Sequence, residues 1–180
     1  MIIEDIKGQP VIEADRFILR PLQASDAGLI TLYAGDERVA RMTTSIPHPM
    51  PPGAAEAFIA RAQSEDRTED VWVIDSSRSG GAELVGLIGM ERMEGDQSEV
   101  GYWIAPAFWN TGIASEAVAA ILAANPQGVS VIFASVFQDN PASARVLTNC
   151  GFSYLGDAES FSVARGSNVR TWTYSQRLKG

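Results

Sequence analysis

The segment Gly101–Glu116 reads GYWIAPAFWNTGIASE and predicts a strand, a short loop and a helix in direct succession. We expect the strand over residues 99–105, because this segment is aromatic and apolar and because Pro106 cannot donate to a central ladder. We expect the helix over residues 113–124, ended by Asn125-Pro126. Its apolar residues form one stripe suited to a core, namely Ala114, Val118, Ile121 and Leu122.

The junction between this strand and helix has the chemistry of an anion site. A helix N-terminus carries unpaired N–H groups and the positive end of the helix dipole. Gly112 has no Cβ, so a ligand can approach the backbone closely there. Such an end suits a phosphate or a pyrophosphate. A strand–helix turn that merely needs a glycine has the same signature, and the segment by itself favours this second interpretation.

The composition is that of an ordinary globular protein. With 180 residues, 46% apolar and 20% charged, we expect a single domain over residues 1–180, with residues 1–15 as an N-terminal extension. The net charge of −8 argues against a nucleic-acid partner and is compatible with a cationic substrate such as an amine. No apolar run approaches membrane-spanning length and residues 1–15 lack a signal pattern, so we expect a cytoplasmic protein without a membrane partner.

Few residues of this chain could bind a metal or form a disulfide. Cys150 is the only cysteine, which excludes an internal disulfide and a cysteine-based metal site. His48 is the only histidine and lies in the proline-rich segment 41–53, which we expect to be a stiff loop. A solvated loop position for His48 is favoured over a pocket-facing role. We therefore predict no metal site.

The rest of the chain alternates between strand and helix patterns. Strands are expected at 17–22, 71–74, 84–92, 129–137, from 152 onward and at 170–178, and helices after Ser25-Asp26, over 54–62 and after Asn140-Pro141. Residues 71–105 predict an antiparallel meander of three strands. Residues 129–137 are apolar on both faces, as in a strand that is buried on both sides. Because that strand follows a strand–helix crossover, it should lie parallel to 99–105.

Two motifs carry a resemblance to a known family. They are GYWIAPxxWxxGIAxEA at 101–117 and NPASxxVLxxxGF at 140–152. In this order and separation they resemble the GNAT acyltransferase superfamily, and they are most similar to the branch that includes ribosomal-protein N-terminal acetyltransferases. The segments FILRPL at 17–22 and IPHP at 46–49 are similar to the same branch. The resemblance covers most of residues 16–178.

The resemblance implies an α/β fold with a mixed, mostly antiparallel sheet of about seven strands flanked by about four helices. Two central parallel strands would splay apart, here 99–105 and 129–137, and acetyl-CoA would enter between them. The implied cofactor-binding residues are the backbone of Thr111, Gly112, Ile113, Ala114 and Ser115 for the pyrophosphate, Ile104 for the pantetheine amides, and Asn140 and Ser143 near the thiol arm. Superfamily dimers are common, although nothing in this sequence marks an interface.

The sequence departs from the superfamily pattern at three positions. Trp109 fills the first place of the loop, where the superfamily usually has Arg or Gln. Asn110 stands where the branch commonly has glycine, and Asn tolerates positive φ better than most residues. Many members carry a tyrosine as general acid on the helix after the second splayed strand, and here that place is Leu147.

Candidate catalytic residues follow from the chemistry that acyl transfer needs. Ser143 is the candidate acid for the departing thiolate, with a purely positioning role at the helix start as an equal alternative. Glu99, at the mouth of the central strand, is the candidate base, and a solvated strand-end glutamate is the somewhat favoured alternative. Glu116 is assigned only a favourable interaction with the helix dipole. Tyr102 and Trp103 could line the acceptor pocket, although aromatic strand residues more often belong to the core.

These observations predict an acetyl-CoA-dependent N-acetyltransferase with direct transfer and no covalent enzyme intermediate. The acceptor is expected to be a primary amine: a protein N-terminus, an amino acid or a small polyamine-like molecule. The alternative is an acyl-CoA-binding module that has lost transferase activity and serves as a sensor or partner, an interpretation supported by the missing tyrosine at Leu147.

Overall fold

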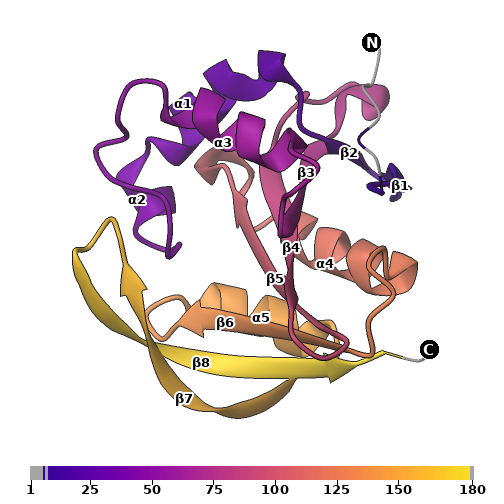
Figure 1. The fold of residues 1–180 in the computed structure, drawn as a ribbon, viewed down its shortest axis with the longest axis vertical. Helices are drawn as coiled ribbons and strands as arrows, with labels where there is room; N and C mark the ends of the chain where they lie inside the picture. The colour runs from indigo at the N-terminus through magenta and orange to yellow at the C-terminus, as the bar shows by residue number, and fades with distance from the viewer. Residues whose placement is uncertain (1–5, 7, 179–180) are drawn as a thin grey trace.

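The computed structural model describes Ile6 and residues 8–178, which form an eight-stranded sheet in the order β1-β2-β3-β4-β5-β6-β8-β7 (Figure 1). Neighbouring strands are antiparallel, except for the parallel pair β5 and β6. The strands are β1 (Ile12–Glu13), β2 (Ile18–Pro21), β3 (Glu69–Asp75), β4 (Gly86–Met93), β5 (Gln97–Ile104), β6 (Val131–Phe137), β7 (Ser153–Ser162) and β8 (Ser167–Arg177). The helices are α1 (Ala27–Ala34), α2 (Glu37–Ala40), α3 (Ala54–Gln63), α4 (Ile113–Ala124) and α5 (Pro141–Asn149).

The predicted mixed fold is confirmed, with corrections at its edges. Helix α4 has the predicted bounds, and residues 41–53 contain neither helix nor strand. The expected helix after Ser25-Asp26 opens with a 3-10 turn, Ala24–Asp26, before α1 begins. The expectation of about seven strands and four helices misses β1 and α2, which are too short to carry a periodic pattern. Every described helix falls short of the length and apolar character needed to cross a bilayer.

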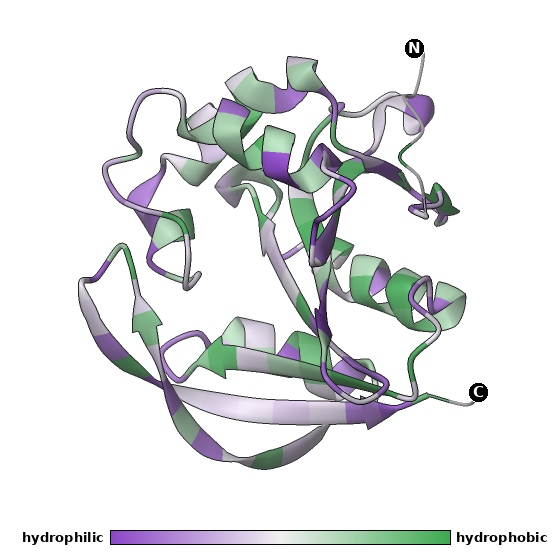
Figure 2. Ribbon diagram, in the orientation of Figure 1, coloured by the Kyte–Doolittle hydropathy of each residue, from purple (hydrophilic) through white to green (hydrophobic). Residues whose placement is uncertain are grey.

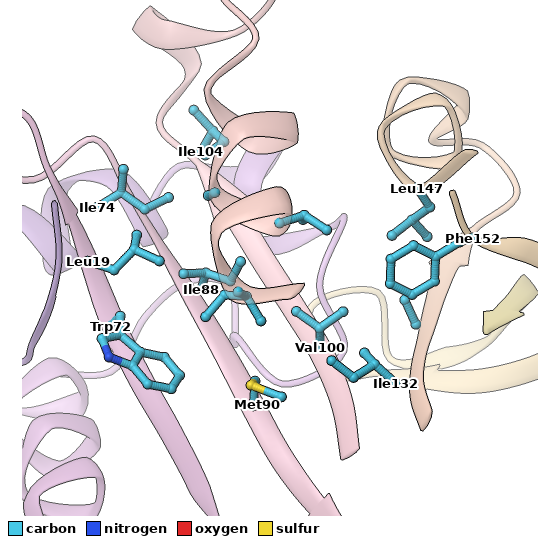
Figure 3. Close-up of a cluster of buried hydrophobic side chains, with 14 of the residues drawn as sticks. Leu19, Trp72, Ile74, Ile88, Met90, Val100, Ile104, Ile132, Leu147 and Phe152 are labelled. Atoms are coloured by element: carbon cyan, nitrogen blue, oxygen red, sulfur yellow. The ribbon is translucent and has the colours of Figure 1, made fainter. Parts of the chain in front are cut away.

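Alternating strand residues face two separate groups of helices. One face of the sheet packs against α4 and α5, and part of this core is shown in Figure 3. The other face packs against α1 and α3. The apolar stripe of α4 belongs to the first core, in agreement with the mostly green colour of this helix in Figure 2. The first core includes Ile88, Val100, Ile104, Ile132 and Leu147, and the second includes Ile30, Ile59, Val71, Val73 and Leu87.

A buried arginine ties α1 to the sheet. The side chain of Arg20 in β2 is only 1% exposed. Its Nε donates to Oδ2 of Asp75 at 2.7 Å, and its Nη2 donates to Oδ1 of Asp26 at 2.8 Å. Removing one partner from a buried ion pair leaves an uncompensated charge, at a cost of about 3–5 kcal/mol. The arginine of the FILRPL segment therefore has a structural role, since it joins β2, β3 and the turn before α1.

Candidate active site

The strands β5 and β6 part soon after they begin to pair. Their parallel pairing covers only residues 97–99 with residues 131–133, although β5 continues to Ile104 and β6 continues to Phe137. The predicted splay of two central parallel strands is therefore confirmed. Beyond the paired positions, each strand presents an unpaired backbone edge to the gap between them.

The free edge of β5 carries backbone donors that face the gap. The N–H of Ala105 donates to the carbonyl oxygen of Val85 at 2.9 Å, so this residue faces β4. Because hydrogen-bonding direction alternates along a strand, the N–H groups of Tyr102 and Ile104 face β6 instead. The carbonyl oxygen of Ile104 already accepts a 2.7 Å hydrogen bond from Nε1 of Trp109. The Ile104 N–H is therefore the group available for the predicted pantetheine contact, and Trp109 anchors the loop to the strand end.

The loop after β5 brings the start of α4 to the open end of the gap. Asn110 has a φ of 62°, as its tolerance for positive φ predicts, and Gly112 has a φ of 80°. Gly112 is the N-cap of α4, and no side chain of the described residues caps this helix start. The amides of the first turn are thus left for a ligand. They belong to Ile113, Ala114 and Ser115, which with Thr111 and Gly112 make up the predicted pyrophosphate cradle.

Arg16 braces this loop from the N-terminal side of the chain. Its backbone N–H donates to Oε2 of Glu116 at 3.0 Å, its Nε donates to Oε1 of Glu116 at 2.6 Å, and its Nη1 donates to the carbonyl oxygen of Thr111 at 2.9 Å. Glu116 therefore does more than favour the helix dipole, which was the only role expected from the sequence. The contact joins residues 100 positions apart, so no local pattern could have revealed it.

We expect Glu116→Ala to weaken acetyl-CoA binding about fivefold, because Arg16 would no longer hold the loop and a half-exposed ion pair contributes about 1 kcal/mol. Isothermal titration calorimetry of the purified protein would measure this change. Glu13→Ala is the matched control, since it removes an exposed ion pair with Arg78 and neither residue lines the cavity. Equal affinities for the two variants would contradict the bracing role.

A single large cavity connects the gap to the loop 41–53. Its volume is about 1010 Å³, at the upper end of small-molecule sites, which suits a long ligand. It is lined by residues from both splayed strands, the first turn of α4, the start of α5, and the helices α1 and α3. All of the predicted site residues line it: Glu99, Ile104, Thr111, Gly112, Ile113, Ala114, Ser115, Asn140 and Ser143.

A tyrosine from β5 meets Ser143 at the start of α5. The hydroxyl oxygen of Tyr102 lies 2.7 Å from Oγ of Ser143, and either atom can be the donor. Asn140 caps α5 as predicted, because its Oδ1 accepts from the Ser143 N–H at 3.3 Å. Burial, only partly offset by the hydrogen bond with Ser143, raises the pKa of Tyr102 to about 12. Tyr102 is therefore a neutral phenol at physiological pH and can donate to Ser143.

Residue 147, where many family members carry the tyrosine, is a core residue in this chain. Leu147 is 0% exposed and packs in the core between α5 and the sheet (Figure 3). The phenol at the site comes instead from β5, through Tyr102. The sequence alone suggested only that Tyr102 lines the acceptor pocket or belongs to the core. Tyr102 lies on the same face of β5 as Val100 and Ile104, and this face points toward α5. Its contact with Ser143, however, depends on tertiary packing.

Glu99 lies on the other face of the sheet, in a row of three carboxylates. It is directly opposite Glu91 of β4, which in turn is opposite Glu69 of β3. Burial and then the charge of Glu91 raise the pKa of Glu99. Burial, followed by the charges of Glu91, Glu99 and Asp70, raises the pKa of Glu69 to about 7. The cavity thus has a hydroxyl pair on one face of the sheet and a carboxylate row on the other.

We expect Glu69→Gln to raise the Tm at pH 8 by about 3 °C and to leave the Tm at pH 4 unchanged. The pKa of Glu69 is about 7 in the folded protein and near 4.5 in the unfolded chain, so the folded protein keeps this proton to a higher pH. Stability therefore falls as the pH rises through this window, and the cost stays in full above it. Glutamine removes that cost, and at pH 4 both side chains are neutral. Calorimetric scans at the two pH values would measure the difference, and an equal shift at both would contradict the assignment.

Comparison with known proteins identifies the family. Residues 16–153 match the family model described as acetyltransferase (GNAT) domain. The chain is 31% identical over 179 residues to the uncharacterized N-acetyltransferase YoaA of Bacillus subtilis, with 92% of this chain and 96% of that protein covered.

Solved structures share the fold at low sequence identity. The microcin C7 self-immunity acetyltransferase MccE, in complex with acetyl-CoA and AMP, has a TM-score of 0.78 at 14% identity, covering 91% of this chain and 93% of that chain. The ribosomal-protein-S5-alanine acetyltransferase of Vibrio fischeri has a TM-score of 0.76 at 19% identity, covering 95% and 98%. With its splayed strands, bare helix start and matching family model, this chain belongs to the GNAT acetyltransferase family.

Proposed function

We propose that this protein is an acetyl-CoA-dependent N-acetyltransferase that transfers the acetyl group directly to a primary amine. One observation carries the proposal: a single cavity joins the uncapped start of α4 to the Tyr102–Ser143 pair across the gap between β5 and β6. Acetyl transfer needs such an arrangement, because the diphosphate and the reacting thioester lie at opposite ends of the same long molecule. The curated N-acetyltransferase relative supports nitrogen as the acceptor atom.

The residues of this chain suit the parts of acetyl-CoA. The amides of residues 111–115 would bind the diphosphate, and the Ile104 N–H would bind a pantetheine carbonyl. Asn140 and Ser143 would contact the arm near the sulfur. Acetyl-CoA supplies a thioester-activated acetyl group, and holding both reactants in one cavity provides much of the acceleration.

The two proton transfers would take place on opposite faces of the sheet. Glu99, on the α1 and α3 face, would take a proton from the amine, and the raised pKa of this carboxyl suits it to a base. A carbon–nitrogen bond forms and the carbon–sulfur bond breaks. Ser143, on the opposite face, would give a proton to the departing sulfur and recover one from Tyr102, which would regain its own proton from water while Glu99 releases the proton of the amine to water. The net result is an amide and a free thiol, with one proton moved from nitrogen to sulfur.

The alternative, an acyl-CoA-binding module without transfer, draws its support from the missing helix tyrosine. Tyr102 weakens that support, because it places a phenol 2.7 Å from Ser143 by another route. The structure therefore favours transfer over binding alone.

A panel of acceptors would test the proposal. The purified protein would be incubated with acetyl-CoA and, separately, a peptide with a free N-terminus, an amino acid and a small amine, with free thiol followed over time. We expect thiol release that depends on an acceptor and an acetylated product of matching amount. Thermal stabilisation by acetyl-CoA without acceptor-dependent release would instead identify the binding module.

A further inference from the structure

The tip of the β7–β8 hairpin contacts the other half of the sheet. Strands β5 and β6 pair only where they begin, so the half with β1–β5 and the half with β6–β8 have no strand pairing toward the other ends of β5 and β6. There the hairpin turn, residues 163–166, lies beside the segment that follows α2 (Figure 1). The N–H of Val163 donates to the carbonyl oxygen of Thr44 at 3.0 Å. The hairpin therefore connects the two halves where their strands have parted.

One side chain of this turn, Arg165, makes most of the connection. Its Nη1 and Nη2 donate to the two carboxylate oxygens of Asp139 at 2.7 and 3.0 Å. Its Nε donates to the carbonyl oxygen of Arg41, at the C-terminal end of α2, at 2.8 Å. Its Cζ lies 5.0 Å from the centroid of the Phe137 ring. These contacts need a planar, forked guanidinium, so a lysine could not make them together.

The charges of Arg41, Asp139 and Arg165, here called the Arg165 cluster, are arranged to attract. The side chain of Arg165 is 18% exposed. Its hydrogen bonds with Asp139 lower the pKa of this carboxyl, so the pair stays charged at physiological pH. Nη2 of Arg41 also lies 3.7 Å from the same carboxylate. Isolated surface ion pairs contribute little, but a bidentate pair within a network can hold its segments in place.

The Arg165 cluster lies behind the wall of the cavity. Its three residues do not line the cavity, whereas residues next to them do, namely Met42, Thr44, Phe137 and Asn140. The loop 41–53 packs on the face of the sheet that carries α1 and α3, through Ile46 and Met50. The proposed mechanism places the amine on this face. The cluster therefore sets the position of the amine-side wall relative to the far half of the sheet.

We propose that Arg165 is a positioning residue, which holds the loop 41–53 against the connection between β6 and α5 and so fixes the part of the cavity that receives the acceptor amine. This inference rests on the proposed function and adds a residue that affects acceptor binding without touching the acceptor. The sites for acetyl-CoA do not depend on Arg165, because Arg16 braces the cradle loop and Asn140 caps α5.

Arg165→Gln tests this role with an uncharged side chain. With saturating acetyl-CoA, we expect the KM for the acceptor to rise about tenfold, while kcat and the Kd of acetyl-CoA change by less than about twofold. The probes are ethanolamine, alanine and an alanine-initiated hexapeptide, and the KM is measured for each probe that the wild-type protein acetylates. Arg170→Gln is the matched control and should leave the KM unchanged. Arg170 lies in the same hairpin, pairs with Asp157 and does not line the cavity.

A merely structural role of Arg165 predicts a different result. Loss of folded protein would lower kcat and leave the KM unchanged, and this outcome would overturn the inference. In the expected case, adding Asp139→Asn to Arg165→Gln raises the KM no further, because the two side chains act through one contact. A further tenfold rise in the double variant would contradict the assignment to this pair.

Hydrogen exchange separates the inference from the proposed function. The Val163 amide donates to Thr44, and we expect Arg165→Gln to speed its exchange about tenfold while the amides of α4 keep their wild-type rates. Transfer with an unchanged acceptor KM in Arg165→Gln would overturn the inference and leave the N-acetyltransferase proposal standing. Absence of transfer to any amine by the wild type would overturn the proposed function. The Val163 exchange rate would then decide whether Arg165 holds the loop: a faster rate in the variant supports this role, and an unchanged rate refutes it.

Discussion

Replacing Ser143 by alanine is expected to lower kcat for acetyl transfer by about 100-fold, with little change in acetyl-CoA affinity. The hydroxyl would donate a proton to the departing sulfur, and the variant removes that donor. The backbone N–H of residue 143 would still donate to Oδ1 of Asn140, so the start of α5 should keep its cap. Tyr102 also keeps a partner, because its hydroxyl lies 3.3 Å from the carbonyl oxygen of residue 143. Steady-state kinetics and calorimetry together would measure both quantities.

Tyr102→Phe is the companion variant for this experiment. It leaves the Ser143 hydroxyl in place but removes the phenol that would return a proton to this hydroxyl. We therefore expect kcat to fall by about tenfold. If Ser143 only positions the co-substrate, Ser143→Ala should instead weaken acetyl-CoA binding and leave kcat at saturation close to that of the wild type. That result would remove Ser143 from the proton-transfer step.

Replacing Gly112 by valine is expected to weaken acetyl-CoA binding by about 100-fold. At its φ of 80° a residue with a branched Cβ is strained, so the loop would leave its left-handed conformation. A Cβ here would meet only Nη2 of Arg16, at 3.5 Å, so the protein has room to fold. The loss should arise because the amides of the first turn no longer converge on one point. Calorimetric titration with acetyl-CoA would measure it.

Gly128→Val is the matched control for this variant. Gly128 has a φ of 64°, its Cβ would meet nothing within 4 Å, and it lies outside the cavity lining. The two substitutions should therefore have similar costs in stability and different costs in affinity. Comparable losses of affinity, or unchanged affinity in Gly112→Val, would contradict the cradle assignment.

Elements with strong local signals were predictable from the sequence alone. Helix α4 is bounded by Gly112 and by Asn125-Pro126, and its apolar stripe is continuous, so capping, breaking and periodicity all agree. Helix α5 likewise combines Asn140 as N-cap with Pro141 in its first turn. The pyrophosphate cradle could be predicted from the same segment only with the family resemblance. A single glycine turn has the same sequence whether it binds a ligand or merely connects a strand to a helix.

The features that the sequence did not reveal depend on register and on distant contacts. The carboxylate row exists because Glu69, Glu91 and Glu99 fall at matching positions on three strands, and a shift of one residue would send one of them to the other face. The Tyr102–Ser143 contact spans 41 residues. Such pairs become visible only when the strands and helices are placed in three dimensions.

The parting of β5 and β6 has a consequence for the lifetime of the protein. Only three strand-paired positions join the two halves of the sheet directly. Beyond them, no strand of the chain fills the gap between β5 and β6. A bound acetyl donor would complete the hydrogen bonding at that seam and stabilise the folded state in proportion to its occupancy. Resistance of the purified protein to proteolysis should then increase with the concentration of acetyl-CoA.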